Sequence, residues 1–374
     1  MSKIDLKKIT SISILFTVLI VFLMNCDGNS LSKIDSEIGY LREVQLDNVY
    51  TNEIIPLTNN FISETAALNS LIESFHQSAS IEKLSAIQFQ WKEVITVWKR
   101  LELYNLGTVE DSFIHFEINR WPTNIDFMNT YINGREILNE TFIASKGSSS
   151  KGISAIEYLL FSSQNNQNVL SEFTKNTNFE RRLGYLLALS NNLKSKSEEI
   201  STIWTNDKVR FLSAVENGIN GSQNQLINAM ITLIEEIIIS KLGKPLGEYE
   251  DGRIDFEELE AYRSQTSLLI IQEHLTALKR CYTGSFLQNG IKCGFDNYLK
   301  LMDREALDVR IIVAFENCQN KIDAITTTLQ QELVDNPENI TNLQNAFRAL
   351  LVLIRVDMAT AIGATVTLND TDGD

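Results

Sequence analysis

The sequence predicts an all-α protein made of two up-and-down helical bundles in series. Three observations lead to this prediction. Only 4 prolines and 17 glycines occur in 374 residues, so long stretches contain no helix-breaking residue. Apolar residues in these stretches recur every three or four positions, which is the period of an amphipathic helix. With 44% hydrophobic residues and this length, the chain can bury the cores of two domains.

The N-terminus is predicted to be a bacterial lipoprotein signal peptide, residues 1–25. Three lysines among the first eight residues precede a short uncharged apolar run, and the run ends at the lipobox-like sequence Leu-Met-Asn-Cys26. After cleavage Cys26 would carry the lipid, and the polar residues 26–36 would serve as a tether. The alternative is an uncleaved anchor helix, although the run is short for a membrane span. Both interpretations place the protein at the bacterial cell envelope. If the signal peptide is cleaved, we expect a lipid anchor in the outer membrane, with the protein facing the periplasm or the exterior.

The N-terminal bundle is predicted to cover residues 37–220. Its clearest helix starts at Ser80 and ends near Gly107, with large apolar side chains on one face. Residues 108–123 look irregular, and a polar turn rich in serine follows the helix at 124–144. The other helices of this bundle are expected at 37–79, interrupted by Pro56, and at 153–163, 168–176 and 179–217.

The C-terminal bundle is predicted to cover residues 221–374, because a stretch of glycine and asparagine at 218–221 breaks the helical pattern. Its first helix ends at Lys241, Gly243 and Pro245, which are typical C-terminal signals. Further helices are expected at 254–283, 295–335 and 338–362, followed by an irregular acidic tail.

The charge of the chain argues against one class of partner. The whole sequence has a formal net charge of −15. Removal of residues 1–25 takes away three lysines and one aspartate, which leaves 30 basic and 47 acidic residues and a net charge of −17. A chain this acidic repels nucleic acid, so nucleic acid is not expected to be a partner. The expected partner is the membrane, through the N-terminal lipid anchor.

Three cysteines remain after Cys26. Cys281 and Cys293 flank a glycine-containing stretch, and the cell envelope permits disulfides, so these two residues are candidates for a bridge. Cys318 lies on an apolar helical face and is expected to be a buried free thiol.

Glu157 stands out among the residues that could perform chemistry. It lies inside the apolar run of KGISAIEYLLF, residues 151–161, where a carboxylate is costly unless it is paired or acts as a ligand. Ser154 lies three residues earlier and shares its helical face. Ser154 and Glu157 also fit a capping box, in which they would only close the start of a helix. Spacing alone favours the capping box. The chain contains no His-Glu-x-x-His, Gly-x-Ser-x-Gly or phosphate-binding motif.

The same segment resembles the signature of the imelysin family, formerly classed as peptidase family M75. The family motif is Gly-x-His-x-x-Glu followed by an apolar run; Gly152 and Glu157 match it, and Ser154 replaces the histidine. Residues 260–267 are similar to a second family stretch, Glu-Ser-x-x-Ser-x-x-Ser, with Ala261 at the first serine. Lys244-Pro245-Leu246, Trp121-Pro122 and the acidic C-terminus are also similar to lipoprotein members. The resemblance spans roughly residues 37–374.

This resemblance implies a fold, a site and a range of functions. Imelysin-like proteins are bacterial envelope proteins with two helical bundles and are often associated with iron acquisition. The residues that carry over to a site between the bundles are Gly152, Ser154, Glu157, Glu260, Ser264 and Ser267. Arg263, which lies within the second stretch, is a further candidate site residue. Iron or another divalent cation is a candidate cofactor, although serine at position 154 is a poor ligand for a transition metal.

We therefore expect a non-enzymatic ligand-binding or metal-binding accessory lipoprotein that works with iron-uptake proteins. The alternatives are a metal-dependent peptidase and an interaction scaffold whose site has decayed. The sequence also predicts that Glu157 faces the C-terminal bundle and receives a hydrogen bond from Arg263, Ser264 or Ser267.

Overall fold

The computed structural model describes residues 28–249, 252–288, 290 and 292–367, and these residues form no β-strand. The all-α prediction is therefore confirmed. Cys26 and the predicted signal peptide lie outside the described residues, as does the end of the acidic tail. The N-terminal bundle contains α2 (Gly28–Val49), η1 (Tyr50–Ile54), α3 (Ile55–Gln77), α4 (Ile81–Leu101), η2 (Glu102–Tyr104), α5 (Thr108–Asp111), α6 (Ile114–Ile118), α7 (Ile125–Asn133), α8 (Glu140–Ala144), η3 (Ser148–Ser150), α9 (Gly152–Leu160), α10 (Asn166–Thr174) and α11 (Phe179–Ser213).

The C-terminal bundle follows after a short connection between Ser213 and Ser222, where the sequence analysis placed the domain boundary. Its elements are α12 (Ser222–Glu236), η4 (Ile237–Gly243), η5 (Phe256–Glu258), α13 (Ser267–Thr283), α14 (Phe295–Leu301), α15 (Glu305–Asp323), α16 (Leu329–Asp335), α17 (Pro337–Val352), η6 (Leu353–Met358) and α18 (Ala359–Ile362).

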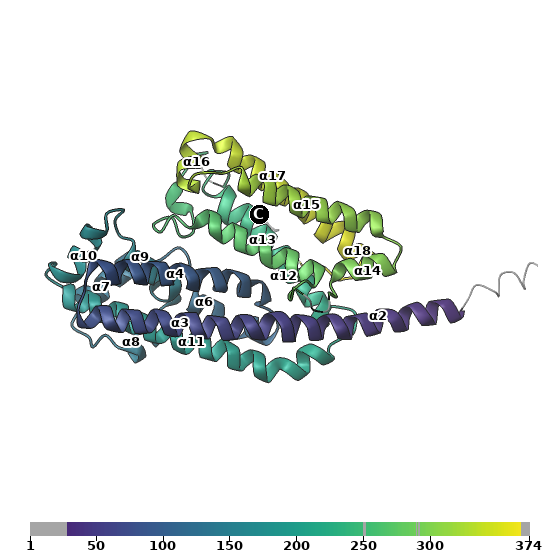
Figure 1. Cartoon of the computed structure of the whole chain (residues 1–374), viewed down its shortest axis with the longest axis horizontal. Coiled ribbons are helices and arrows are strands. Elements are labelled where there is room, and N and C mark those ends of the chain that lie inside the picture. Colours follow the sequence, from purple (N-terminus) through teal and green to yellow (C-terminus); the bar gives the residue numbers. More distant parts are fainter. Residues whose placement is uncertain (1–27, 250–251, 289, 291, 368–374) are drawn as a thin grey trace, which may run out of the picture.

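The two bundles lie one above the other. In Figure 1, α2 and α3 run as one long rod along the lower layer, and α4 and α11 lie beside it. The upper layer contains α15 and α17, while α12 and α13 lie between it and the lower layer. Helix α13 packs on α4, so these two helices form much of the contact between the bundles.

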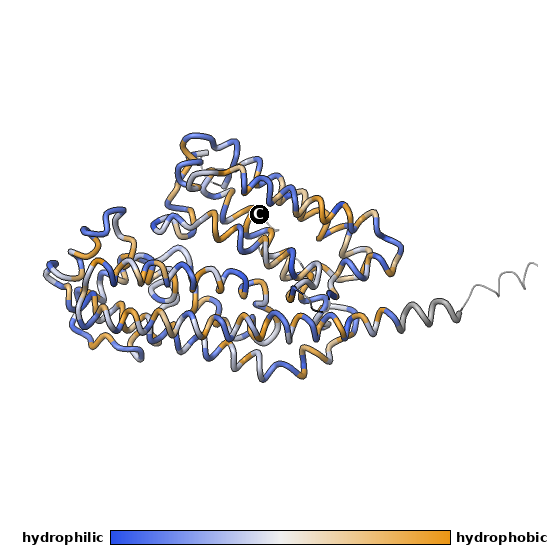
Figure 2. Tube along the Cα trace, in the orientation of Figure 1, coloured by the Kyte–Doolittle hydropathy of each residue, from blue (hydrophilic) through white to orange (hydrophobic). Residues whose placement is uncertain are grey.

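The apolar stripe of α4 explains how the N-terminal core forms. The side chains of this stripe are buried, including Trp91 and Trp98. Ser80 caps the helix by accepting a hydrogen bond from the Lys83 amide at 3.4 Å. Figure 2 shows the same alternation of apolar and polar residues along the other long helices. Burial of these stripes against one another is the main force that holds each bundle together.

Several predicted helix boundaries are wrong. Pro56 does not interrupt the first helix, because it lies in the first turn of α3, where proline is tolerated, and the preceding turn η1 is π-helical. The tether predicted at 26–36 is already helical from residue 28. The helix predicted at 124–144 is two short helices, α7 and α8, and the irregular stretch 108–123 contains α5 and α6.

Two long helices predicted in the C-terminal bundle are also divided. Residues 254–266 are mostly turns, so the helix predicted at 254–283 begins only at Ser267. The helix predicted at 295–335 consists of α14, α15 and α16, with a first break where Asp303 has a φ of +55°. These turns use no glycine or proline, so the sequence pattern gave little sign of them.

The predicted disulfide is not formed, because the two thiols have different neighbours. Cys281 is fully buried in the hydrophobic core, whereas Cys293 donates to the carbonyl oxygen of Leu41 at 3.6 Å. Cys318 is a buried free thiol, as the sequence predicted.

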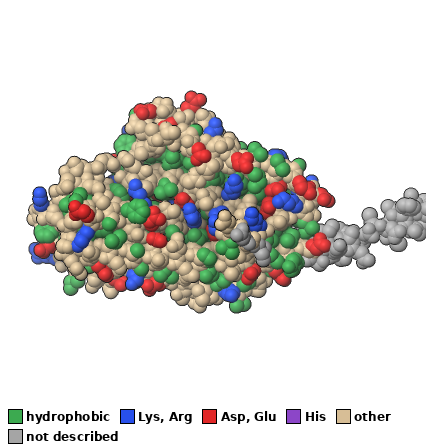
Figure 3. Space-filling model, viewed as in Figure 1, with side chains coloured by type: hydrophobic (Ala, Val, Ile, Leu, Met, Phe, Trp, Pro, Cys, Tyr) green, Lys and Arg blue, Asp and Glu red, His purple; other side chains and the backbone are tan. Residues whose placement is uncertain are grey.

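The surface shows no segregation of charge on the face in Figure 3, where acidic and basic side chains are interspersed. Within the described residues, no helix is both long enough and apolar enough to span a membrane.

Candidate functional site

The site begins with Gly152, which is the first residue of α9 and has a φ of +76°. A Cβ atom at this position would lie 2.2 Å from the carbonyl oxygen of Ile118. Only glycine allows the end of α6 to pass this close to α9. The close approach pairs Asn119 with Gly152 in an isolated antiparallel bridge and brings the Asn119 side chain next to α9.

Ser154 is not a helix cap. The N-cap of α9 is Lys151, and Ser154 already lies within the first turn, so the capping-box interpretation is wrong. The buried hydroxyl of Ser154 instead donates to Oδ1 of Asn119 at 2.7 Å. Position 154 is therefore tied to the polar groups between the bundles.

Glu157 lies on the face of α9 that meets the C-terminal bundle, and it is 5% exposed. Its Oε1 accepts two hydrogen bonds from Ser264, one from the backbone amide and one from the hydroxyl, both at 2.8 Å. Burial raises the pKa of Glu157 to about 7, although these hydrogen bonds and the charge of Arg263 favour the ionised form. Both protonation states of the carboxyl group are therefore accessible near neutral pH.

Ser264 lies in the turns that precede α13, because α13 begins only at Ser267. Ala261 and Gln265 have φ values of +57° and +59°, and these left-handed residues fold the loop so that the Ser264 amide points at Glu157. The Ser264 hydroxyl also contacts Oγ1 of Thr266 at 2.7 Å. Ser267 does not reach Glu157; its hydroxyl donates to the Glu260 carbonyl at 2.6 Å.

Glu260 belongs to a second part of the site, where ion pairs join the two bundles. Its Oε1 lies 2.7 Å from Nζ of Lys99 on α4, and its Oε2 lies 2.6 Å from Nζ of Lys241 in η4. Asn119 donates to Oε1 at 2.8 Å. Burial favours the protonated form, but the two lysines outweigh it and hold the pKa of Glu260 at about 2.

The ion pairs continue beyond Glu260. Lys99 lies 2.9 Å from Glu102, and Lys241 lies 2.7 Å from Glu236. Nε2 of His274 lies 2.7 Å from Oε2 of Glu102, and burial lowers the pKa of His274, so this imidazole is neutral at pH 7. We call the five charged residues the buried ion cluster, with Glu236 as its partly exposed end: Lys99, Glu102, Glu236, Lys241 and Glu260.

A small pocket of about 160 Å³ opens beside Glu157. Arg263 lines it and stacks on Tyr262, with the guanidinium carbon 4.2 Å from the ring centroid. Arg263 contributes charge near Glu157 but makes no hydrogen bond to it. The full lining is Trp121, Pro122, Thr123, Ile125, Ser154, Glu157, Glu257, Glu258, Tyr262 and Arg263.

The residues around Glu157 do not fit a transition-metal centre. The histidine of the family motif is replaced by Ser154, whose hydroxyl is already bonded to Asn119, and Glu157 has one oxygen engaged by Ser264. Among the described residues, no group of three or more His, Cys, Asp or Glu side chains could hold a metal ion. The pocket offers hydrogen-bonding and charged groups for a polar ligand instead.

The structure thus brings Gly152, Ser154, Glu157 and Ser264 together, with Arg263 at the pocket wall. Sequence reasoning missed the lysines of the buried ion cluster. Lys99 follows Trp98 inside the buried face of α4, and a lysine at such a position could have indicated a buried ion pair. Lys241 was interpreted only as a basic residue at a helix end, and Asn119 carried no signal at all.

The fold and site define a class of two-bundle helical proteins with a polar site between the bundles. The model of the imelysin family, peptidase M75, matches residues 56–356. The chain therefore belongs to the imelysin family.

Two solved structures share the fold. An imelysin-like protein from Psychrobacter arcticum 273-4 has a TM-score of 0.73 and 16% sequence identity, over 88% of this chain and 98% of that chain. A protein from Parabacteroides distasonis ATCC 8503, designated an iron-regulated protein A precursor, has a TM-score of 0.68 and 15% identity, over 86% of this chain and 95% of that chain. None of the curated proteins matches the chain significantly.

Proposed function

We propose that this protein is a non-enzymatic accessory lipoprotein of the cell envelope that binds a small polar ligand during iron uptake. The single observation that carries the proposal is the arrangement of Glu157. Its carboxyl group lies between the bundles, accepts hydrogen bonds from Ser264 of the opposite bundle and lines a pocket. Ligand binding there would touch both bundles at once. The iron-related part of the proposal is supported by family membership and by the designation of the Parabacteroides relative.

The chemistry of the pocket favours binding over catalysis. Glu157 can accept or donate a hydrogen bond, because its pKa of about 7 allows both protonation states. Arg263 offers a guanidinium group for a carboxylate or another anion. Peptide hydrolysis by a metallopeptidase needs a bound metal that activates water, and the donor set around Glu157 does not supply one.

The test is calorimetric titration of the mature protein with ferric citrate, a polar iron chelate, and separately with calcium, a hard cation. We expect ferric citrate to bind with a stoichiometry of one and calcium not to bind, because no group of acidic side chains among the described residues could hold a metal ion. Glu157→Gln should weaken ferric citrate binding by about tenfold or more. Glu53→Gln is the matched control, because Glu53 is equally buried and ion-paired with Arg280 but does not line this pocket.

Two results would contradict the proposal. Equal binding in both variants would place the ligand elsewhere, and no binding of either probe would favour an interaction scaffold. Casein hydrolysis that is abolished by a chelator would establish the peptidase alternative.

The lipid anchor is a separate part of the proposal and rests on the sequence before Cys26. We expect the protein made in bacteria to partition into detergent, and Cys26→Ala to partition into the aqueous phase. A Cys26→Ala protein that still entered the detergent phase after signal cleavage would contradict lipid attachment at this cysteine.

A further inference from the structure

Arg263 places a cation in the wall of the Glu157 pocket. Its guanidinium carbon lies 4.2 Å from the ring centroid of Tyr262 and 5.4 Å from that of Tyr158, so the group stacks on two aromatic rings. Among the described residues, its guanidinium N–H groups form no ion pair and donate no hydrogen bond. These donors are therefore available for an anionic group of a ligand, such as a carboxylate.

Glu157 places an acceptor in the same pocket. Its Oε1 is bonded to Ser264, whereas its Oε2 accepts no hydrogen bond from the described residues. The side chain is only 5% exposed, and Oε2 is not fully buried, so this oxygen contributes to the exposure on the pocket side. Because polar groups that are largely buried are rarely left unpaired, Oε2 calls for a ligand that donates a hydrogen bond.

The opposite charges share the pocket without neutralising each other. Arg263 is close enough for its charge to favour the ionised form of Glu157, yet the two side chains form no ion pair. Glu257 and Glu258 also line the pocket, and neither forms an ion pair with a described residue. An anion alone would pair only with the guanidinium group, and a cation alone only with the carboxyl groups. A ligand that carries both charges can pair with both.

The pocket is small and partly apolar. Its volume of about 160 Å³ is well below the roughly 300 Å³ at which sites for drug-sized ligands begin, so the two charges of the ligand must lie a few bonds apart. Trp121, Pro122 and Ile125 supply a lining that suits a short aliphatic side chain. We propose that this pocket binds a free α-amino acid with a short apolar side chain, its carboxylate on Arg263 and its ammonium group on Glu157. This inference rests on the proposed function, because it names the ligand class of the same site.

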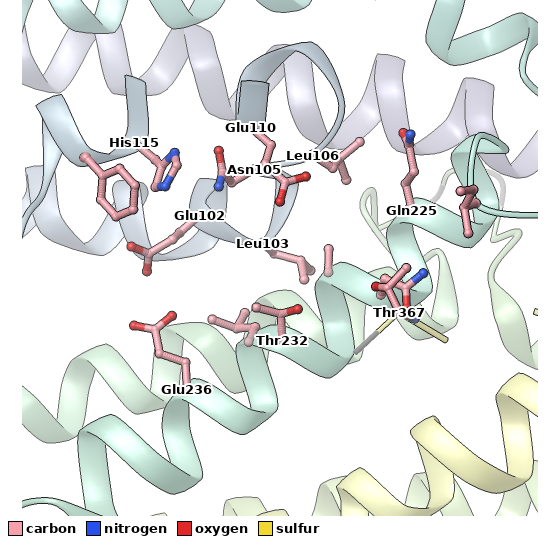
Figure 4. A pocket seen from close by; sticks show the side chains of 15 residues that line it. Glu102, Leu103, Asn105, Leu106, Glu110, His115, Gln225, Thr232, Glu236 and Thr367 are labelled. Carbon is pink, nitrogen blue, oxygen red and sulfur yellow. Dashed lines mark hydrogen bonds between the residues drawn. The ribbon is translucent and has the colours of Figure 1, made fainter. Parts of the chain in front are cut away.

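A larger cavity between the bundles lacks this combination of charges. Its volume is about 480 Å³, and Figure 4 shows Glu102 on one wall opposite Glu236 of α12 on the other. No lysine or arginine is among the described residues that line it. The carboxylate of an amino acid would find no cation in its wall, so we expect binding at the Glu157 pocket alone.

The experiment is a calorimetric titration of the mature protein with L-alanine, propionate and ethylamine. Propionate is L-alanine without the ammonium group, and ethylamine is L-alanine without the carboxylate. We expect L-alanine to bind with a stoichiometry of one, and each analogue to bind at least about tenfold more weakly, because it lacks one charge-assisted hydrogen bond. Arg263→Gln should weaken L-alanine binding by about tenfold or more for the same reason.

Release of protons gives a second readout of the contact with Glu157. An ammonium group beside this carboxyl group lowers its pKa from about 7, so binding at pH 7 should release part of a proton. Titration in two buffers of different ionisation enthalpy measures this release. Glu157→Gln should abolish it, because the glutamine side chain does not titrate.

Arg120→Gln and Glu110→Gln are the matched controls. Arg120 also stacks on an aromatic ring, 4.6 Å from the centroid of Phe116, but it lines neither cavity. Glu110 lines only the larger cavity. Both variants should bind L-alanine within about twofold of wild type.

Four results would overturn the inference: undetectable binding of L-alanine at millimolar concentration, an analogue that binds as tightly as L-alanine, no release of protons, or an equal loss in Arg263→Gln and Arg120→Gln. If ferric citrate binds in a manner that depends on Glu157 while L-alanine does not bind, the proposed function stands and only the amino-acid ligand is wrong. If neither probe binds, both proposals fail.

Discussion

Burial of the Glu157 carboxyl group costs folding free energy, but it also gives the group a pKa that suits a binding site. Its carboxyl group lies in an apolar run of α9, and the required hydrogen bonds come from Ser264, more than a hundred residues away. These bonds do not fully offset the loss of water, so the pKa of Glu157 is about 7. The residue therefore changes its charge near neutral pH.

The raised pKa of Glu157 predicts a change of stability with pH. Between pH 4.5 and pH 7 the folded state keeps a proton that the unfolded state has released, so stability from this group is present below pH 4.5 and is lost as pH rises through 7. The shift corresponds to about 3 kcal/mol. The free energy of unfolding should be measured with urea at a series of pH values for wild type and for Glu157→Gln, which keeps every other titrating group. Between pH 4.5 and pH 7, wild type should lose up to this amount of stability relative to the variant. A constant difference between the two proteins would refute the raised pKa.

Part of the site could be predicted from residue patterns and part could not. Glu157 was found because a charged residue interrupts an apolar run, and Ser264 because residues 260–267 resemble a family motif. The role of Asn119 could not be found, because it depends on the close approach of Ile118 to Gly152. That approach is a property of the folded chain, and it leaves no periodic mark in the sequence.

Among the secondary-structure elements, the presence of long helices was predictable from the sequence, but the residues at which they begin and end were not. The long apolar stripes of α4 and α11 identify helices, because burial of one face is visible as a period in the sequence. The loop before α13 was mistaken for helix, since its left-handed residues are Ala261 and Gln265 rather than glycines. Tertiary contacts hold these turns, and this same loop supplies Ser264 to the site.

The start of α9 provides a test of local backbone geometry. Gly152→Ala should lower the free energy of unfolding by about 1–3 kcal/mol or more, because φ is +76° and the new Cβ would collide with Ile118. Gly184→Ala in α11 is the control; nothing lies within 4 Å of its Cβ position, and it should gain roughly 0.5–1 kcal/mol. Thermal or urea unfolding measures both. Equal effects in the two variants would show that the close approach at Gly152 is not required.

At the scale of the whole molecule, the buried ion cluster joins the bundles. Lys99 comes from α4, whereas Lys241 and Glu260 come from the C-terminal bundle. Removal of one partner leaves a charge buried without compensation. We expect Lys99→Met to lower the free energy of unfolding by about 3 kcal/mol.

A surface ion pair provides the control for this prediction. Lys196 lies 2.7 Å from Glu199 within α11, so Lys196→Met should cost less than about 1 kcal/mol. Denaturant unfolding followed by circular dichroism compares the two variants. A cost for Lys99→Met as small as that for Lys196→Met would mean that the ion cluster does not hold the bundles together.

We propose that the pocket beside Glu157, which is lined by residues of both bundles, is the ligand site of this imelysin-family protein. The most direct measurement is a crystal structure of the mature protein soaked with the probe that binds in calorimetry. We expect new density within hydrogen-bonding distance of the Glu157 carboxyl group, with Arg263 or Tyr262 on its other side. Density in another place, with the Glu157 pocket unchanged, would contradict it.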